Sequence, residues 1–153
     1  MIELLNGAWT YLVPFVVLLT ILVFVHEMGH YSVARFFGVS VETFSIGFGR
    51  ALVTWKDKAG TDWKIGWLPL GGYVKFLGDE DATSVKKSEA PVTLAPGQRM
   101  FHEQPLYARA AVVAAGPAAN FLFAIIVLAV VFATMGQSFT PAVVDAVIED
   151  TAA

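Results

Sequence analysis

The sequence predicts an α-helical membrane protein, in which two transmembrane helices are joined by a cytoplasmic loop that contains a membrane-associated β-hairpin. Three observations lead to this fold class. Hydrophobic residues make up 56% of the 153 residues and charged residues only 15%, against about 25% charged in a typical globular protein. Residues 4–25 and 110–144 contain no charge, and each segment exceeds the roughly 20 residues that cross a bilayer. Between them, residues 63–67 alternate polar and apolar side chains as a strand does.

The first transmembrane helix is predicted over residues 8–36. Its N-terminal flank contains Glu3 but no Lys or Arg, and no small-residue cleavage site follows the apolar run. A signal peptide would have a basic flank and such a site. We therefore expect a helix that stays in the mature protein.

The second transmembrane helix is predicted over residues 110–135. Gly116-Pro117 lies near its beginning, and proline fits either the first turn of a helix or a kink inside one. Asn120 follows in an apolar run, where an amide needs a hydrogen-bonding partner. The sequence leaves open whether Asn120 packs against the first helix or faces a polar cavity.

Basic residues predict the orientation of both helices. All 10 Lys and Arg lie between Arg35 and Arg109, and positive charge favours the cytoplasmic side of a membrane. We expect a cytoplasmic loop with both ends of the chain on the opposite side. A net charge of −3 gives no basic surplus for nucleic acid. The absence of cysteine excludes disulfides and thiolate chemistry in this chain.

The loop is predicted to contain two parts. Residues 39–78 form the β-hairpin: a segment rich in β-branched and aromatic residues, a polar turn at 56–62, and the alternating strand. Residues 79–98 are polar, contain Pro and Gly, and are typical of a linker.

The chemical signal is the pentapeptide His26-Glu27-Met28-Gly29-His30. In a helix, residues four apart share a face, so His26 and His30 can bind one zinc ion. Glu27 lies about 100° round the helix from His26, within reach of a water that this zinc activates. The less specific alternative for the motif is an interfacial His/Glu cluster that merely ends the span. The alternative function is a metal-binding or adaptor membrane protein without catalysis.

Two histidines do not complete a catalytic zinc site, which commonly has three protein ligands. The third His of the metzincin pattern is missing, because Val33 and Phe36 occupy the positions where Gly and His would be needed. Other acidic or imidazole side chains are conceivable ligands, although none lies in a recognisable motif: Glu42, Asp57, Asp62, Asp79, Glu80, Asp81 and His102.

Four motifs in order, HEMGHYSVARFFGV, FSIGFGR, PLGGYVKF and AAGPAANF, resemble the site-2 proteases, most closely the bacterial regulator-of-sigma-E protease group. The resemblance implies an intramembrane zinc endopeptidase of the bacterial inner membrane that cleaves transmembrane segments of membrane-bound regulatory proteins. It implies zinc ligation by His26 and His30 and acid/base catalysis by Glu27. It also implies that Gly47, Phe48 and Gly49 belong to a β-loop that contacts the substrate.

One departure from the family pattern is informative. In this family the third zinc ligand is an aspartate of an L-D-G motif in a later transmembrane helix, and no L-D-G occurs here. We therefore expect residues 1–135 to be the N-terminal part of a peptidase domain. Residues 136–153 resemble the beginning of a periplasmic PDZ domain. Alone, this chain is expected to bind zinc weakly and to be inactive.

Overall fold

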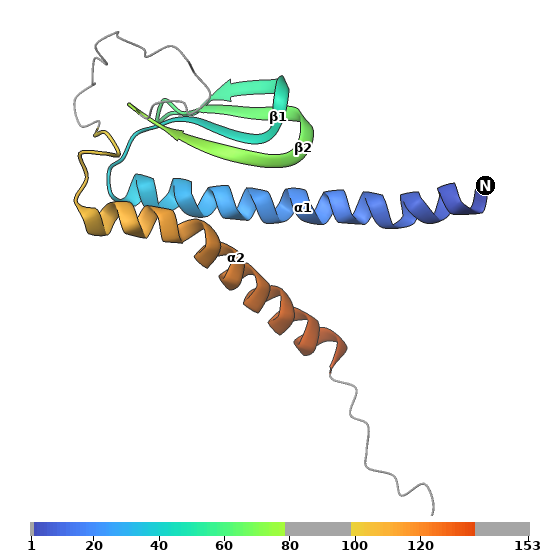
Figure 1. Ribbon diagram of the computed structural model, residues 1–153. Coiled ribbons are helices and arrows are strands. Elements are labelled where there is room, and N and C mark those ends of the chain that lie inside the picture. Colours follow the sequence, from blue (N-terminus) through green and yellow to red (C-terminus); the bar gives the residue numbers. More distant parts are fainter. Residues whose placement is uncertain (1, 79–98, 137–153) are drawn as a thin grey trace, which may run out of the picture.

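The computed structural model describes residues 2–78 and 99–136. The chain forms helix α1 (Ile2–Phe36), strands β1 (Val41–Lys56) and β2 (Asp62–Phe76), and helix α2 (Leu106–Met135) (Figure 1). The predicted order of a helix, a hairpin and a second helix is therefore confirmed. The linker predicted at 79–98 lies outside the described residues, as do all but the first residue of the PDZ-like segment.

Helix α1 begins earlier than predicted, at Ile2, and ends at Phe36, where the prediction placed its end. Its last turn is closed by two backbone bonds, because the amide of Gly38 donates to Arg35 (3.0 Å) and that of Val39 donates to Ala34 (2.9 Å). Gly38 has a φ of 74°, a conformation that glycine adopts without steric cost. The chain can then turn directly into the sheet.

Helix α2 begins at Leu106, before the predicted residue 110, and Pro105 is its N-cap. Pro117 therefore lies inside the helix, which decides between the two interpretations of Gly116-Pro117. A proline at this place removes one backbone hydrogen bond and bends the helix. Figure 1 shows α2 running beside α1 at first and then turning away from it.

Both helices are long and apolar enough to cross a membrane, over Trp9–Phe36 and Leu106–Met135. They meet at Gly29, where an added Cβ would lie 2.8 Å from the Cβ of Ala119. A residue without a side chain lets two helix backbones approach closely, as small residues do in membrane proteins.

The two strands form an antiparallel sheet in which each strand is strongly bent. Phe44 therefore has two partners, Val74 on one side and Trp63 on the other, while Trp55 pairs with Trp63 across the hairpin. Residues 43–46 thus lie between the two halves of β2. Among the described residues, β2 segment 72–76 and β1 segment 51–56 have a strand partner on one side only.

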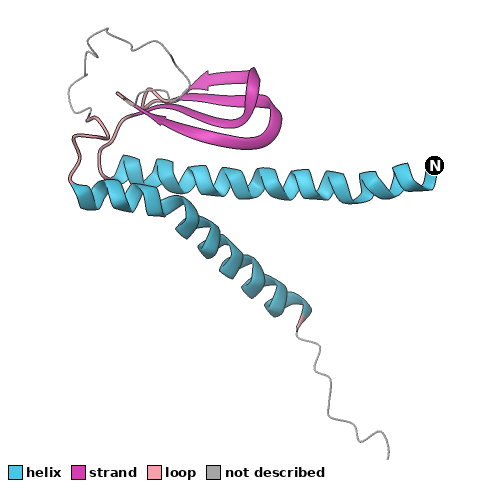
Figure 2. Cartoon of the chain, viewed as in Figure 1, coloured by secondary structure: helices cyan, strands magenta, loops and turns pink. Residues whose placement is uncertain are grey.

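The hydrophobic core lies where the sheet meets the helices near the C-terminal end of α1 (Figure 2). Val39 and Val112 are almost fully buried there, and Phe44 of the sheet is fully buried as well. Phe44 also makes an edge-on ring contact with Tyr31 of α1, with centroids 5.7 Å apart. These contacts fix the sheet against the half of α1 that carries the two histidines.

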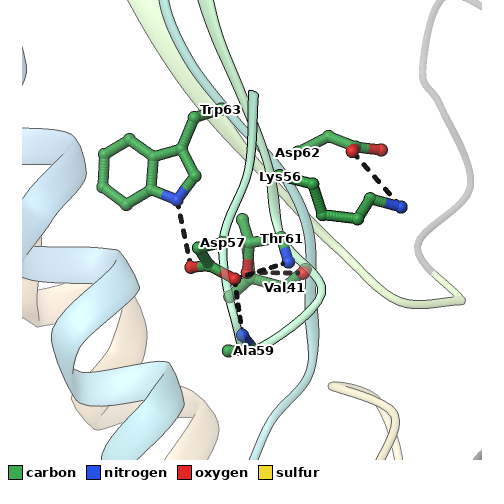
Figure 3. A network of polar contacts seen from close by, with 7 residues as sticks. All are labelled: Val41, Lys56, Asp57, Ala59, Thr61, Asp62 and Trp63. Carbon is green, nitrogen blue, oxygen red and sulfur yellow. Dashed lines mark hydrogen bonds and ion pairs between the residues drawn. The ribbon is translucent and has the colours of Figure 1, made fainter. Parts of the chain in front are cut away.

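Asp57 connects the hairpin turn to α1, and Figure 3 shows its contacts within the hairpin. One carboxylate oxygen accepts hydrogen bonds from the amides of Ala59 and Thr61, at 2.8 and 2.9 Å. The other accepts from the indole of Trp63 and, outside the figure, from the hydroxyl of Tyr31, each at 3.1 Å. Burial raises the pKa of Asp57. The four hydrogen bonds lower this pKa by more than burial raises it, so it lies below its ordinary value.

We expect Asp57→Ala to lower the free energy of unfolding by about 2–3 kcal/mol at neutral pH, because several hydrogen bonds to a charged acceptor are lost. A lowered pKa means that the carboxylate stabilises the fold fully above its unfolded-state pKa of about 3.9. This stabilisation disappears as the pH falls further, through the folded-state pKa. Thermal unfolding followed by circular dichroism at pH 7 and below pH 4 measures both effects.

Asp62→Ala is the matched control for this prediction. Its carboxylate pairs with Lys56 at 3.3 Å, and the two side chains are 42% and 63% exposed (Figure 3). Exposed ion pairs contribute little to stability. If Asp62→Ala destabilised the protein as much as Asp57→Ala, the special role of Asp57 would be wrong.

Candidate metal centre

Helix α1 places the two motif histidines one turn apart, with their rings directed at one point. The Nε2 atoms of His26 and His30 lie 3.2 Å apart. Zinc–nitrogen bonds of about 2.0–2.1 Å at a tetrahedral angle separate two ligand nitrogens by about 3.3 Å. The pair therefore has the geometry of two ligands to one zinc ion.

The second ring nitrogen of His30 is held by α2. Its Nδ1 lies 2.7 Å from the backbone oxygen of Val112. A carbonyl oxygen only accepts hydrogen bonds, so Nδ1 donates and Nε2 keeps its lone pair. Metal-binding histidines commonly have such a partner on their other nitrogen.

Helix α2 also leaves room for an ion, through Gly116. A Cβ built on Gly116 would lie 2.7 Å from Nε2 of His26 and would come into still closer contact with Nε2 of His30. The absence of this side chain keeps open the space at which both nitrogens point. The residues present thus fit a metal ion. From the sequence, Gly116 was interpreted only with Pro117, as a helix start or a kink.

Glu27 lies beside the histidines on the side of α1 that faces the sheet. It lines a cavity of about 370 Å³ together with His26 and Phe48, and a second of about 350 Å³ together with His30. A Cβ on Gly72 would lie 3.1 Å from Cγ of Glu27. The Glu27 side chain therefore lies against β2 and borders the two cavities that the histidines line.

Of the three residues that were predicted to contact the substrate, only Phe48 lines the cavity of Glu27. The ring of Phe48 lies over Gly71. Gly47 and Gly49 each have a φ of 82°, and neither belongs to the residues lining that cavity. A Cβ on Gly47 would lie 2.8 Å from the oxygen of Leu68, so this glycine allows the bend within the sheet.

No third metal ligand joins His26 and His30 among residues 2–78 and 99–136. Asp57 and Asp62 have the partners described above, and Glu42 pairs with Lys75 at 3.4 Å. His102 is exposed and lies close to Gly78. None of these four residues therefore joins the two histidines, and the other three conceivable ligands are outside the described residues: Asp79, Glu80 and Asp81.

Asn120 faces the site, which decides the alternative that the sequence left open. Its side-chain nitrogen lies 3.4 Å from Nδ1 of His26, and it lines the same cavity as Glu27. The signal for this position was the presence of one amide in an apolar helix, which costs free energy without a partner.

Comparison with known proteins agrees with this geometry. The profile described as "Peptidase family M50" matches residues 14–152. A protein of Rhizobium meliloti named "Putative zinc metalloprotease R01501" is 51% identical over 146 residues, which cover 94% of this chain and 39% of that protein. Metalloprotease MmpA of Caulobacter vibrioides is 42% identical over 155 residues, covering 93% of this chain and 38% of its own length.

The chain therefore spans about two fifths of the length of the curated relatives it matches. Both names contain the word metalloprotease, and the first also specifies zinc. The family match covers most of the chain, and the resemblance found in the four sequence motifs is confirmed. The chain belongs to peptidase family M50, the site-2 proteases.

Proposed function

We propose that this protein is an intramembrane zinc endopeptidase that cleaves transmembrane segments of membrane-bound regulatory proteins. The observation that carries the proposal is the 3.2 Å separation of two imidazole nitrogens, beside a glutamate that lines one cavity with His26 and another with His30. Membership of the family and the names of the relatives support the same reaction class.

His26 and His30 would hold the zinc ion, and a third ligand would come from outside the described residues. When bound, zinc supplies Lewis acidity, which makes water nucleophilic near neutral pH. Glu27 accepts a proton from the attacking water as its oxygen bonds to the peptide carbonyl carbon. Glu27 then gives this proton to the leaving amide nitrogen as the C–N bond breaks, and an amine and a carboxylic acid result, the second proton of the water remaining on the acid.

A transmembrane substrate must unwind before it can react, because the carbonyl in a helix is already hydrogen-bonded and covered. Segment 72–76 of β2 has a strand partner on one side only among the described residues. Gly72 of this segment lies against Glu27. The proposed substrate adds as an extended strand along this edge, as in other cases of β-augmentation. Phe48 then contacts its side chains from within the cavity.

The proposed location is the bacterial inner membrane, with the loop cytoplasmic and both ends of this chain periplasmic. Apolar side chains of both helices are exposed, such as Trp9 (63%) and Leu122 (59%). The sheet also exposes Leu52 (68%) and Trp67 (65%). Lipid contact would cover this apolar area, and tryptophan is favoured at the membrane interface.

Cleavage of a single-span reporter, reconstituted in liposomes with the protein that contains this chain, tests the proposal. We expect a zinc chelator to stop cleavage, zinc to restore it, and His30→Ala to eliminate both zinc binding and cleavage. His102→Ala is the control, because this exposed histidine lies away from the site. Cleavage that resists chelation would contradict the proposal, and bound zinc without cleavage of any reporter would favour a metal-binding adaptor instead.

A further inference from the structure

Asn120 has an unusual hydrogen-bonding state for a residue in an apolar helix. Its amide nitrogen lies 3.4 Å from Nδ1 of His26. Its amide oxygen, Oδ1, is buried and has no hydrogen-bond partner among the described residues. A buried acceptor without a donor is costly and calls for an explanation.

The first arrangement, with the amide nitrogen facing His26, conflicts with metal binding. Nδ1 of His26 then accepts the hydrogen bond, so a neutral ring carries its proton on Nε2. Nε2 is the atom that faces His30 at 3.2 Å. A proton there removes the lone pair that a metal ion needs, and Oδ1 of Asn120 remains unpaired.

The second arrangement follows from turning the amide by half a turn, which exchanges its nitrogen and oxygen. Oδ1 then accepts a hydrogen bond from the Nδ1–H of His26, and the buried oxygen gains its partner. The proton is now held on Nδ1, so Nε2 of His26 directs its lone pair to the same point as Nε2 of His30. His30 already has this state, through the backbone oxygen of Val112.

We propose that Asn120 is a positioning residue of the metal centre: its amide oxygen accepts a hydrogen bond from Nδ1–H of His26 and so keeps Nε2 available for the ion. Helix α2 then supplies an acceptor to each histidine, one from its backbone and one from a side chain. The proposal rests on the zinc site of the proposed function, but it does not depend on which substrate is cleaved or whether any is.

Two substitutions at this position separate the acceptor from the shape of the side chain. Asn120→Asp keeps an acceptor oxygen near His26. Asn120→Leu keeps a similar volume but has no acceptor. Thr134→Val is the matched control on α2, because the hydroxyl of Thr134 is exposed and bonds only within its own helix, to Val130 at 2.8 Å and Val131 at 3.3 Å.

The experiment measures the zinc dissociation constant of the purified protein in detergent by competition with a fluorescent chelator. We expect Asn120→Leu to weaken zinc binding by about 10–100-fold, as is typical for the loss of an outer hydrogen bond to a ligand. Asn120→Asp and Thr134→Val should remain close to the wild type. Equal affinity of Asn120→Leu and wild type would overturn the proposal, whereas a wild type that binds no zinc would overturn the proposed function instead.

A second measurement needs no variant, which protects the test if Asn120→Leu fails to fold. Nitrogen-15 NMR of the zinc-loaded wild type distinguishes a protonated Nδ1 from a protonated Nε2. We expect His26 to carry its proton on Nδ1 and to bind the ion through Nε2. Coordination through Nδ1, or a protonated Nε2, would contradict the assigned role of Asn120.

Discussion

Glu27→Gln is expected to lower kcat for peptide cleavage by roughly 10²–10⁴-fold, the contribution of a positioned general acid/base. Glutamine has nearly the same shape as glutamate, but its amide cannot take a proton from water at neutral pH. The packing of the Glu27 side chain against Gly72 is retained, and both imidazoles are unchanged. The fold and the zinc affinity should therefore stay close to those of the wild type.

The measurement is single-turnover cleavage of a reconstituted reporter, together with zinc content and thermal unfolding of the same preparation. Glu42→Gln is the control, because Glu42 pairs with Lys75 on the sheet surface at 3.4 Å and does not line the cavity of Glu27. A normal rate for Glu27→Gln would eliminate Glu27 as the proton acceptor. A low rate accompanied by lost zinc would assign it to the integrity of the site instead.

Gly116→Ala is expected to remove zinc binding almost completely, with a loss of affinity of at least about 100-fold, larger than for most changes outside the ligands. The new methyl group would lie 2.7 Å from Nε2 of His26 and in closer contact with Nε2 of His30. It would therefore occupy the space into which both nitrogens point. Alanine has a higher helix propensity than glycine, so the helix itself should remain intact.

Zinc titration and circular dichroism of the same sample separate these two effects. Gly7→Ala is the control, because nothing lies within 4 Å of a Cβ built on this other helical glycine. It should bind zinc as the wild type does. Wild-type affinity in Gly116→Ala would show that the ion does not lie between the histidines and α2.

The sequence was sufficient for the parts of the fold that depend on local pattern. Helix α1 ends at the predicted residue, and its four-residue spacing brings the rings of His26 and His30 together. The polar turn after Lys56 joins two paired strands as expected. Each of these features follows from a period or a composition that neighbouring residues determine.

The rest of the site depends on contacts between elements distant in sequence. Gly116 and Asn120 meet His26 only because α2 packs against α1, and nothing around them in sequence specifies this partner. Pro117 was ambiguous because proline suits both a first turn and a bend. Asp57 looked like a possible ligand, although its carboxylate is fully engaged by the turn and by α1, since a capping aspartate and a ligand are the same residue type.

The outer half of β1 has a consequence for handling the protein in water. Segment 51–56 has a strand partner on one side only among the described residues, and it exposes Leu52 and Val53 by 68% and 52%. An open apolar edge of this kind invites intermolecular pairing and aggregation. Arg50 precedes the segment and Lys56 ends it, so both can act as charged gatekeepers. Loss of detergent and neutralisation of these two charges should therefore promote precipitation by the same route.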